Sequence, residues 1–339
     1  MKPVASIIVL TYNSRPYLDS CLSSLLDQSV PADEYEVIVA DNGSSDGSAD
    51  YVAAHYPAVH VLRFEHNYGF AEGNNRAAQA AGGRYLGFQN VDTVAHHNWL
   101  GALLKAITSD PEVKACHPAA LPLNGQGQHE RHAFIPRGYL SELNSLGCVA
   151  FRQISLAQDP FPTLFLAGGS ALIDRTLSEE LPYIFDPTFF LYNEDTDLGL
   201  RINNLGYKVL FVPTAVAYHE RHPSRRLYLN RGNLRRAYLV NRNRYLTFYK
   251  NMTGPEFLLT VPLLCLGSLD KAWGLDLDWT RRAAYTLGVL PFTLLTLLLA
   301  AIHFPAYRHD RRAILSRRAH GRFWLLRELW RRRNWNIEL

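Results

Sequence analysis

Short runs of β-branched and apolar residues alternate, over the first hundred positions, with segments whose apolar side chains recur at helical spacing. The apolar runs predict four strands, at 5–10, 36–40, 59–64 and 85–88. The helical spacing, seen for example in Leu18, Leu22 and Leu25, predicts three helices, at 15–28, 48–55 and 71–81. Strands that alternate with helices predict an α/β fold with a mostly parallel sheet.

The pattern changes twice further along the chain. Glycine, proline, asparagine, glutamine and histidine crowd residues 118–137 and predict a loop. Three elements are predicted next: a strand interrupted by glycines at 165–173, a helix at 196–204 and a strand at 207–212. Two long apolar stretches, 257–269 and 283–304, then follow on either side of the polar link 270–282.

Charge is distributed very unevenly. Residues 1–220 carry 13 basic and 24 acidic side chains, a net of −11, whereas residues 221–339 carry 22 and 7, a net of +15. This asymmetry predicts an anionic partner for the C-terminal part, either a membrane surface or a nucleic acid. The aromatic share of 12% and ordinary glycine and proline contents exclude a disordered chain.

The cysteines and the N-terminus indicate where the protein resides. The four cysteines are scattered without a CxxC pair, which predicts neither a zinc site nor a disulfide framework. The first apolar run stops at Thr11, too early for a signal peptide. We therefore expect the chain on the cytoplasmic side.

Polar clusters follow the predicted strands, where an open parallel sheet binds its ligands. Thr11-Tyr12-Asn13 follows the first strand, and the segment from Asp41 to Ser48 follows the second. A carboxylate there can accept a hydrogen bond from a pyrimidine imide, although a polar turn with a helix N-cap is the alternative. The segment from Asn67 to Arg76 is suited to holding ribose and phosphate at a helix start.

Two further polar clusters contain carboxylates that are candidates for metal binding and proton transfer. Asn90-Val91-Asp92 lies just past the fourth strand, and one carboxylate there can bind Mg²⁺ whose shell is completed by diphosphate oxygens. Glu194, Asp195 and Asp197 lie behind the aromatic residues Phe189, Phe190 and Tyr192. Such surroundings raise the pKa of at least one carboxyl, which then can take up a proton. An ordinary turn, and an acidic first turn of a helix, are the respective alternatives.

Taken in order, these motifs resemble those of glycosyltransferase family 2, most of all its bacterial rhamnosyltransferase-like branch. The resemblance covers roughly residues 3–250 and rests on Asp41-Asn42 with Asp46, Asn67-x-Gly69-Phe70, Asn90-x-Asp92, Glu194-Asp195-x-Asp197-Leu198 with Arg201, and His219. It implies a GT-A type nucleotide-diphospho-sugar transferase that inverts the anomeric carbon. The C-terminal region would then form membrane-associating helices.

The resemblance also implies roles for individual residues. Asp195 would be the catalytic base, and Asp92 and His219 would hold Mg²⁺ or Mn²⁺. Arg225 follows His219 closely and is a candidate to hold the diphosphate, although the start of a basic surface is the alternative. The other donor-binding residues would be Thr11, Tyr12, Asn13, Asp41, Asn42, Asn67, Gly69, Phe70, Asn74 and Asn90, and the acceptor-side residues Tyr192, Glu194, Gly168 and Gly169. The family's Asp-x-Asp reads Asn90-Val91-Asp92 here, so only Asp92 brings a charge to the metal.

The apolar stretches raise the question of a membrane. Residues 283–304 are about long enough to span at roughly 20 residues, whereas 257–269 are too few. A single span would place the arginine-rich tail outside, against the positive-inside tendency. A hairpin or two interfacial helices remain, and Pro262 and Pro291 favour the interfacial form. Tryptophans between the tail arginines also fit an interfacial helix. A third alternative for the two apolar stretches is a buried helix pair in a soluble protein.

These observations predict three parts: a catalytic GT-A domain at 1–220, a basic helical connector at 221–255 and a membrane-associated helical region at 256–339. We expect transfer of L-rhamnose from dTDP-rhamnose to a lipid-linked saccharide acceptor at the cytoplasmic face of a bacterial inner membrane. A UDP-hexose transferase and a non-catalytic binding module for sugar nucleotides or anionic lipids are the rivals. Nucleic acid is not expected as a partner, since long apolar stretches interrupt the basic region, and a homo-oligomer is allowed.

Overall fold

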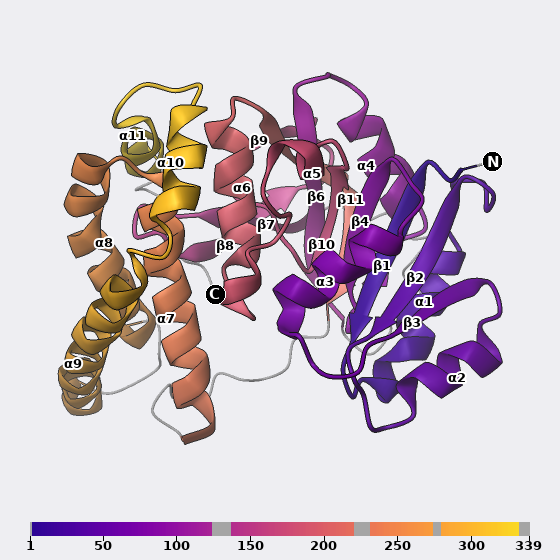
Figure 1. Ribbon diagram of the computed structural model, residues 1–339, viewed down its shortest axis with the longest axis horizontal. Helices are drawn as coiled ribbons and strands as arrows, with labels where there is room; N and C mark the ends of the chain where they lie inside the picture. Colours follow the sequence, from indigo (N-terminus) through magenta and orange to yellow (C-terminus); the bar gives the residue numbers. More distant parts are fainter. Residues whose placement is uncertain (1, 124–136, 220–230, 274–278, 332–339) are drawn as a thin grey trace.

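A mixed β-sheet lies between two layers of helices, and a group of C-terminal helices packs beside it (Figure 1). The computed structural model describes residues 2–123, 137–219, 231–273 and 279–331. One half of the sheet consists of parallel strands in the order β3-β2-β1-β4. These strands are β1 (Ala5–Thr11), β2 (Tyr35–Asp41), β3 (Val59–Arg63) and β4 (Tyr85–Asn90). The predicted parallel arrangement of the first four strands is confirmed.

Alternate residues of the central strands face opposite helical layers. In β1, Ile7 and Val9 contribute to one apolar core and Ile8 contributes to the other, as expected for a strand buried on both faces. The first layer contains α1 (Leu18–Leu26), α2 (Ser48–His55) and α4 (Trp99–Ile107). The second contains α3 (Gly69–Ala80), α5 (Leu177–Glu180) and α6 (Glu194–Asn204). Two short 3₁₀ helices are η1 (Arg15–Tyr17) and η2 (Pro187–Phe189).

The other half of the sheet is mixed. Strand β10 is antiparallel to both β4 and β6, whereas β11 is parallel to β6 and antiparallel to β5 and β9. The hairpin of β7 and β8 is attached to β6. These strands are β5 (Thr93–Ala95), β6 (Val113–Pro122), β7 (Arg137–Leu143), β8 (Val149–Ser155), β9 (Phe161–Thr163), β10 (Ser170–Asp174) and β11 (Lys208–His219).

Three predictions in this half were wrong in their boundaries. Residues 118–122 of the predicted loop continue strand β6, because Pro118 lies opposite an irregular stretch of β11 that tolerates a missing N–H. The strand predicted at 165–173 begins only at Ser170, after its two glycines. Strand β11 continues beyond Val212 to His219, because its later residues pair with β5.

Five helices form the C-terminal part: α7 (Arg231–Asn251), α8 (Gly254–Trp273), α9 (Trp279–His303), α10 (Arg308–Ser316) and α11 (Trp324–Arg331). Helices α8 and α9 continue through Pro262 and Pro291, both exposed, so neither proline ends its helix. Among the described residues, each helix taken singly is too short or too polar to cross a bilayer. The apolar part of α9 (Val289–His303) meets the length and composition requirement only together with α10, from which an 81° bend separates it.

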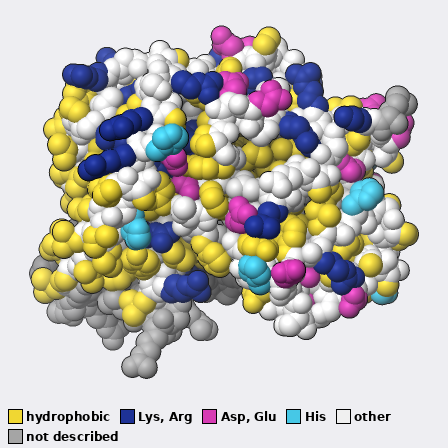
Figure 2. Space-filling view, in the orientation of Figure 1, with side chains coloured by type: hydrophobic (Ala, Val, Ile, Leu, Met, Phe, Trp, Pro, Cys, Tyr) yellow, Lys and Arg dark blue, Asp and Glu magenta, His cyan; other side chains and the backbone are white. Residues whose placement is uncertain are grey.

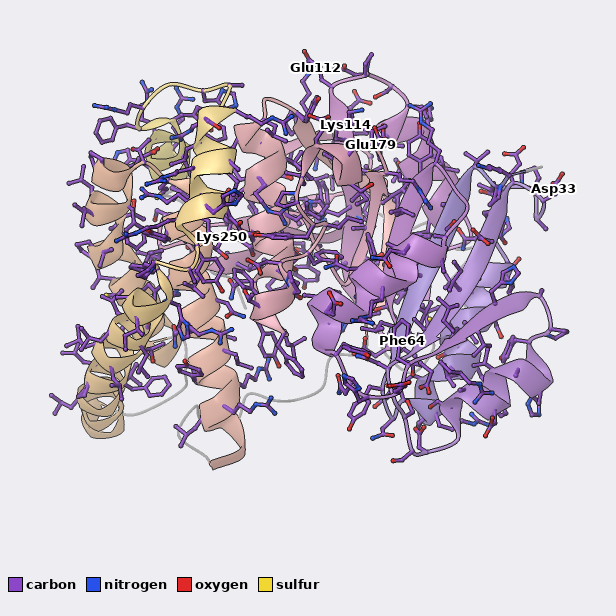
Figure 3. All side chains as sticks on the ribbon, in the orientation of Figure 1. Asp33, Phe64, Glu112, Lys114, Glu179 and Lys250 are labelled. Atoms are coloured by element: carbon purple, nitrogen blue, oxygen red, sulfur yellow. The ribbon has the colours of Figure 1, made fainter. Side chains whose placement is uncertain are left out.

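Buried ion pairs join α7 to α6 and to the segment before η2. The Lys250 ammonium, fully buried, lies 2.6 Å from Asp186 Oδ2 and 2.9 Å from Asp197 Oδ2 (Figure 3). Arg201 Nε, also fully buried, lies 2.8 Å from the same Asp197 oxygen. Burial opposes ionisation of Asp186, but the charge and hydrogen bond of Lys250, with hydrogen bonds from Thr188, hold its pKa below the usual value. Part of the C-terminal positive charge therefore lies inside the protein.

A second buried carboxylate connects α8 to α11. Glu256 accepts hydrogen bonds from the Thr253 N–H, from both terminal nitrogens of Arg318 and from the Leu325 N–H. Burial opposes ionisation of Glu256, yet these donors keep its pKa below the usual value. The Thr253 to Glu256 spacing is that of a capping box, so one residue both caps α8 and anchors α11 and the segment before it.

Candidate active site

The carboxyl ends of β1, β2 and β4 meet at one edge of the sheet. Thr11 lies opposite Asp41 in the β1–β2 pairing, and Leu10 lies opposite Asn90 in the β1–β4 pairing. The polar clusters that follow these strands are therefore brought together, as the strand–helix alternation predicted.

Two buried oxygens at this edge have no hydrogen-bond partner within the described residues. They are Thr11 Oγ1 and Asp41 Oδ1, and the two side chains are 0% and 6% exposed. Leaving a buried polar group unpaired costs about 1–3 kcal/mol, so such atoms are usually satisfied by a ligand or water. Tyr12, next to Thr11, is 48% exposed and offers an aromatic face at the same edge.

Hydrogen bonds join the two loops that follow β1 and β2 at this edge. Asn13, in a left-handed conformation with φ of 50°, accepts the Ser45 N–H through Oδ1 and donates its own N–H to Ser44 Oγ. Asp46 Oδ2 accepts the Arg15 N–H. These contacts hold the loop after β2 against the loop after β1.

Three amides predicted to bind the donor are engaged within the protein. Asn42 Nδ2 donates to Asn67 Oδ1 at 3.0 Å and to the Gly69 carbonyl, and Asn42 Oδ1 accepts the Tyr68 N–H. Asn74, 1% exposed, donates to the Phe70 carbonyl. These contacts fix the loop that enters α3, so a direct donor-binding role for the three amides stays a prediction.

The segment before Asp195 has an unusual backbone that a residue of α7 holds in place. Phe190, Tyr192 and Asn193 all have positive φ angles, a conformation that costs each such residue on the order of 1–3 kcal/mol. Asn243 Nδ2 donates to the carbonyls of Phe189, Leu191 and Tyr192 at 2.8–3.0 Å. Sequence reasoning missed Asn243, because nothing in its basic surroundings distinguishes it.

The same segment also holds the start of α3. The Phe190 carbonyl accepts the N–H groups of Phe70 and Ala71. Gly69, with φ of +81°, lies so close that an added Cβ would be 2.5 Å from the Phe190 ring. Only glycine suits this position. The close contact holds the segment from Phe190 to Asn193 beside the loop that enters α3.

Gly168 and Gly169 lie between Asn90 and the predicted base. Asp195 Oδ2 accepts the Gly168 N–H at 3.1 Å, and Oδ1 accepts the Thr196 N–H at 2.7 Å. The Gly169 carbonyl accepts the Asn90 N–H at 2.8 Å. Two residues span at most about 7 Å, so the Asp195 carboxylate is close to the end of β4.

Burial changes the pKa of two neighbouring acids. It raises the pKa of Asp195, and hydrogen bonds from two backbone N–H groups offset only part of this increase. Glu194 is 5% exposed, its Oε2 has no partner among the described residues, and burial together with the Asp195 charge raises its pKa well above the usual value. The expected rise in the pKa of at least one carboxyl of the cluster agrees with the burial of Glu194 and Asp195. Asp197, the third acid, forms ion pairs with Arg201 and Lys250.

Substitution of Gly168 by alanine is expected to lower kcat/KM for the reaction that the resemblance implies by about 10²-fold, with little change in the urea midpoint. An added Cβ would lie 2.7 Å from Asp195 Cβ and displace the carboxylate, and a shift of about 1 Å in a reacting group can have that effect. Gly321→Ala is the matched control, because its Cβ would meet nothing within 4 Å. Equal kinetics for the two variants would show that the Gly168 contact is unimportant.

Asp92 and His219 form a second pair at this edge. His219 lies opposite Thr93 in the antiparallel pairing of β11 with β5, which brings its Nε2 to 3.5 Å from Asp92 Oδ1. Both side chains are partly exposed, at 21% for Asp92 and 41% for His219. The described residues contain no group of three metal-ligating side chains. One carboxylate and one imidazole still fit a divalent cation whose remaining ligands are diphosphate oxygens and water. Arg225 lies outside the described residues.

Comparisons with known proteins concern the family and the fold of the chain. The model of the family described as glycosyl transferase family 2 matches residues 6–181, just over half of the chain. The N-acetylglucosaminyl-diphospho-decaprenol L-rhamnosyltransferase of Mycobacterium tuberculosis is 28% identical over 247 residues, which cover 67% of this chain and 79% of that protein.

Two solved structures have a similar fold. The mannosyltransferase PcManGT from Pyrobaculum calidifontis, in complex with GDP-Man and Mn²⁺, matches with a TM-score of 0.57 and 20% identity over 94% of this chain and 86% of that one. S. aureus TarS 1-349 in complex with UDP matches with a TM-score of 0.52 and 17% identity over 96% and 91%. The α/β fold is therefore of the GT-A type, with helices added at the C-terminus.

Proposed function

This chain belongs to glycosyltransferase family 2, and on that premise we propose that it transfers L-rhamnose from dTDP-rhamnose to a polyprenyl-diphosphate-linked saccharide. The transfer inverts the anomeric carbon and occurs at the cytoplasmic face of a bacterial membrane, in cell-surface polysaccharide synthesis. In this proposal residues 1–220 are the catalytic domain, 221–255 connect it, and 256–339 associate with the membrane.

The observation that carries the proposal is the position of the Asp195 carboxylate. It is oriented by the Gly168 and Thr196 N–H groups and lies next to the glycines that reach the end of β4. Asp195 accepts the proton of an acceptor hydroxyl while that oxygen bonds to the anomeric carbon. The bond from this carbon to the diphosphate oxygen breaks on the opposite face, which inverts the configuration. The raised pKa of Asp195 makes it a better base than an exposed aspartate.

The donor nucleotide occupies the sheet edge in this proposal. The unpartnered oxygens of Thr11 and Asp41 accept hydrogen bonds from the pyrimidine nucleoside, and the exposed ring of Tyr12 stacks on it. Asp92 and His219 would hold Mg²⁺ or Mn²⁺, which when bound offsets the negative charge of the leaving diphosphate. Asp92 follows the end of β4, which pairs with β1, so a metal ion at Asp92 and His219 would lie near a diphosphate attached to the nucleoside.

The lipid-linked acceptor is proposed from three observations. The name of the mycobacterial relative specifies a decaprenol-linked acceptor. The outer faces of α8 and α9 carry highly exposed leucines, which favours contact with lipid over full exposure to water. The 81° bend between α9 and the arginine-bearing helix α10 suits helices lying along a membrane surface.

Incubation of the full chain with a panel of nucleotide sugars, a polyprenyl-diphosphate-linked saccharide and Mn²⁺ tests the proposal. We expect dTDP-rhamnose to be the donor used with the highest kcat/KM, and the acceptor mass to increase by one deoxyhexose. A larger mass gain, from a UDP-hexose, would replace the donor assignment. If no sugar is transferred while nucleotide sugars bind, the chain is a binding module.

A further inference from the structure

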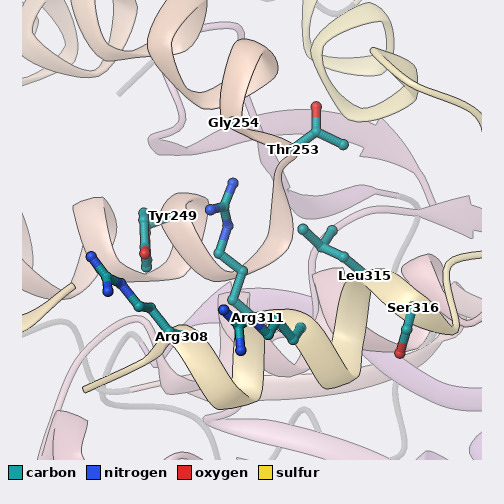
Figure 4. Close-up of a pocket in the computed structure, with 8 residues that line it drawn as sticks. Tyr249, Thr253, Gly254, Arg308, Arg311, Leu315 and Ser316 are labelled. Atoms are coloured by element: carbon teal, nitrogen blue, oxygen red, sulfur yellow. The ribbon is translucent and has the colours of Figure 1, made fainter. Parts of the chain in front are cut away.

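A basic cavity of about 610 Å³ lies where three C-terminal helices meet, apart from the candidate active site. The end of α7, the start of α8 and one face of α10 enclose it (Figure 4). Tyr249 and Thr253 line the cavity, six and ten positions beyond Asn243, the α7 residue that holds the segment before Asp195. At 1.5 Å per helical residue, about 9 Å or more of helix separates the cavity from that segment.

Three arginines of α10 supply the charge of the cavity, and none of the described residues that line it is acidic. Arg311 is fixed: its Nε and Nη2 donate to the Met252 carbonyl, and its guanidinium lies 4.6 Å from the Tyr249 ring centroid. Arg308 and Arg312 are exposed and make no side-chain hydrogen bond or ion pair within the described residues. Figure 4 shows Arg308 and Arg311 extending from α10 on the side of Tyr249 and Gly254.

Nearby carboxylates offset only part of the charge of these arginines. Glu256 pairs with Arg318, whereas Asp310, which accepts a hydrogen bond from the Tyr183 hydroxyl, brings one negative charge to α10 beside the three arginines. Within the described residues the cavity therefore keeps a net positive charge. Guanidinium groups bind phosphate through paired, charge-assisted hydrogen bonds, so phosphate is the anion that this arrangement fits best.

An apolar face continues from the cavity. Leu258 and Leu259, 72% and 60% exposed, lie about one turn beyond Gly254, which lines the cavity. Leu298 and Ile302, 65% and 71% exposed, lie on α9 just before the turn into α10. The face continues with Leu266 on α8 and with Leu287, Leu290, Leu294 and Leu295 on α9. We call these nine residues the leucine face.

The leucine face projects outward from two helices. On α9 most of its residues recur every three or four positions from Leu287 to Ile302, with Leu295 next to Leu294, which is one side of a helix over about 22 Å. Figure 2 shows hydrophobic side chains gathered over α8 and α9, with basic side chains beside them. Side chains that are 41–72% exposed on two adjacent helices match a bilayer surface better than a groove for one lipid chain.

We propose that the cavity binds the phosphate of an anionic glycerophospholipid headgroup while the leucine face enters the acyl region of the same leaflet. This inference rests on the membrane location in the proposed function and assigns a headgroup site to it. Arg308 and Arg312 contact the phosphate, and Arg311, held by Met252 and Tyr249, forms the wall behind it. Because α7 joins this region to the segment before Asp195, bound lipid fixes the orientation of the active site toward the membrane.

Sedimentation of the full chain with lipid vesicles tests the site. We expect tight binding to phosphatidylcholine vesicles that contain one quarter phosphatidylglycerol, and weak binding to phosphatidylcholine alone. The double variant Arg308→Gln/Arg312→Gln is expected to bind the mixed vesicles about 30-fold more weakly, the loss typical of two basic residues at an anionic bilayer. Arg84→Gln/Arg152→Gln removes two exposed arginines of the sheet domain and is the matched control.

Three results would overturn the proposal. The first is equal binding of the mixed vesicles by wild type and the Arg308/Arg312 variant. The second is equal binding of wild type to both kinds of vesicle, which would show that the leucine face alone, and not the cavity, binds the membrane. The third is binding to polyprenyl phosphate in phosphatidylcholine without binding to phosphatidylglycerol, which would make the acceptor the occupant.

A transfer assay separates this site from the proposed function. With a short-chain, water-soluble acceptor and no vesicles, we expect the Arg308→Gln/Arg312→Gln variant to match wild type, because lipid is not required there. If this variant loses transfer under these conditions, its arginines act in the reaction and the headgroup assignment is wrong. Vesicle binding with the expected arginine dependence, in a wild type that transfers no sugar, would support the lipid site and refute the proposed reaction.

Discussion

Replacement of Asp195 by asparagine is expected to lower kcat/KM for sugar transfer by about 10²–10⁴-fold, the usual contribution of a general base. The amide preserves the shape of the side chain but cannot take the proton of the acceptor hydroxyl. Binding of the sugar nucleotide, measured by calorimetry, should stay within a few-fold of wild type, because the Asp195 carboxylate accepts hydrogen bonds from the Gly168 and Thr196 N–H groups and not from Thr11.

The pH dependence of the wild-type enzyme gives a second readout of the same residue. Burial raises the pKa of Asp195, so the carboxylate form that acts as base is lost, as pH falls, at a higher pH than for an exposed aspartate. The acidic limb of log kcat/KM against pH should therefore lie above the usual aspartate range near pH 4 and be absent in the variant.

Asp159→Asn is the matched control, because Asp159 is exposed in the loop between β8 and β9. It should leave both the rate and the pH profile unchanged. Transfer by Asp195→Asn at a near wild-type rate would refute the base assignment. Absence of transfer in wild type as well, with nucleotide binding retained, would favour the binding-module alternative.

Replacement of Lys250 by methionine is expected to destabilise the folded chain by about 3–5 kcal/mol, the usual effect of removing one member of a buried ion pair. Asp197 would keep Arg201 as a partner, whereas Asp186 would keep only its hydrogen bonds from Thr188 and Tyr183. Urea unfolding followed by circular dichroism measures the change. Adding Asp186→Asn to the variant should restore part of the loss, because it removes the uncompensated charge.

Lys208→Met is the matched control for this prediction. Lys208 also pairs with two carboxylates, at 2.7 Å from Asp110 and 2.8 Å from Glu112, but its side chain is 39% exposed. Solvent screens such pairs, so removal of Lys208 should destabilise the chain far less than removal of Lys250. Similar losses for the two variants would show that burial of the Lys250 pair does not decide its contribution.

The same network predicts how stability depends on pH. The pKa of Asp186 is lower in the folded protein than in the unfolded chain, so its contribution is present above about pH 4 and is lost as pH falls through the lowered folded value. The Lys250→Met variant should lose less stability on acidification than wild type, since its Asp186 no longer has that partner.

Much of the active-site edge could be predicted from local patterns. Each strand run ends in a polar cluster, and parallel strands joined by helices place their carboxyl ends on one side. That rule alone brings Thr11, Asp41 and Asn90 together, as the register shows. The boundaries of β6 and β10 were missed because pairing partners far along the chain, and not local propensity, determine where these strands begin and end.

Other parts of the site have no local signature. Asp92 and His219 are 127 positions apart in the chain, and only the pairing of β5 with β11 brings them to 3.5 Å. Asn243 lies among exposed and buried basic residues, yet it holds three carbonyls of the segment before Asp195. Nothing in the spacing of α7 residues distinguishes it from its neighbours.

By itself, the sequence determined the alternation of strands and helices, the cluster of polar residues at the strand ends, and the division between an acidic first part and a basic last part. Only the tertiary structure decided which charges are buried. Lys250 and Arg318 lie inside with Asp186 and Glu256, whereas Arg308 and Arg312 remain at a cavity beside the leucine face. The physical reason is that local spacing reflects backbone periodicity, whereas burial and pairing of a charge depend on partners that folding brings together from distant positions.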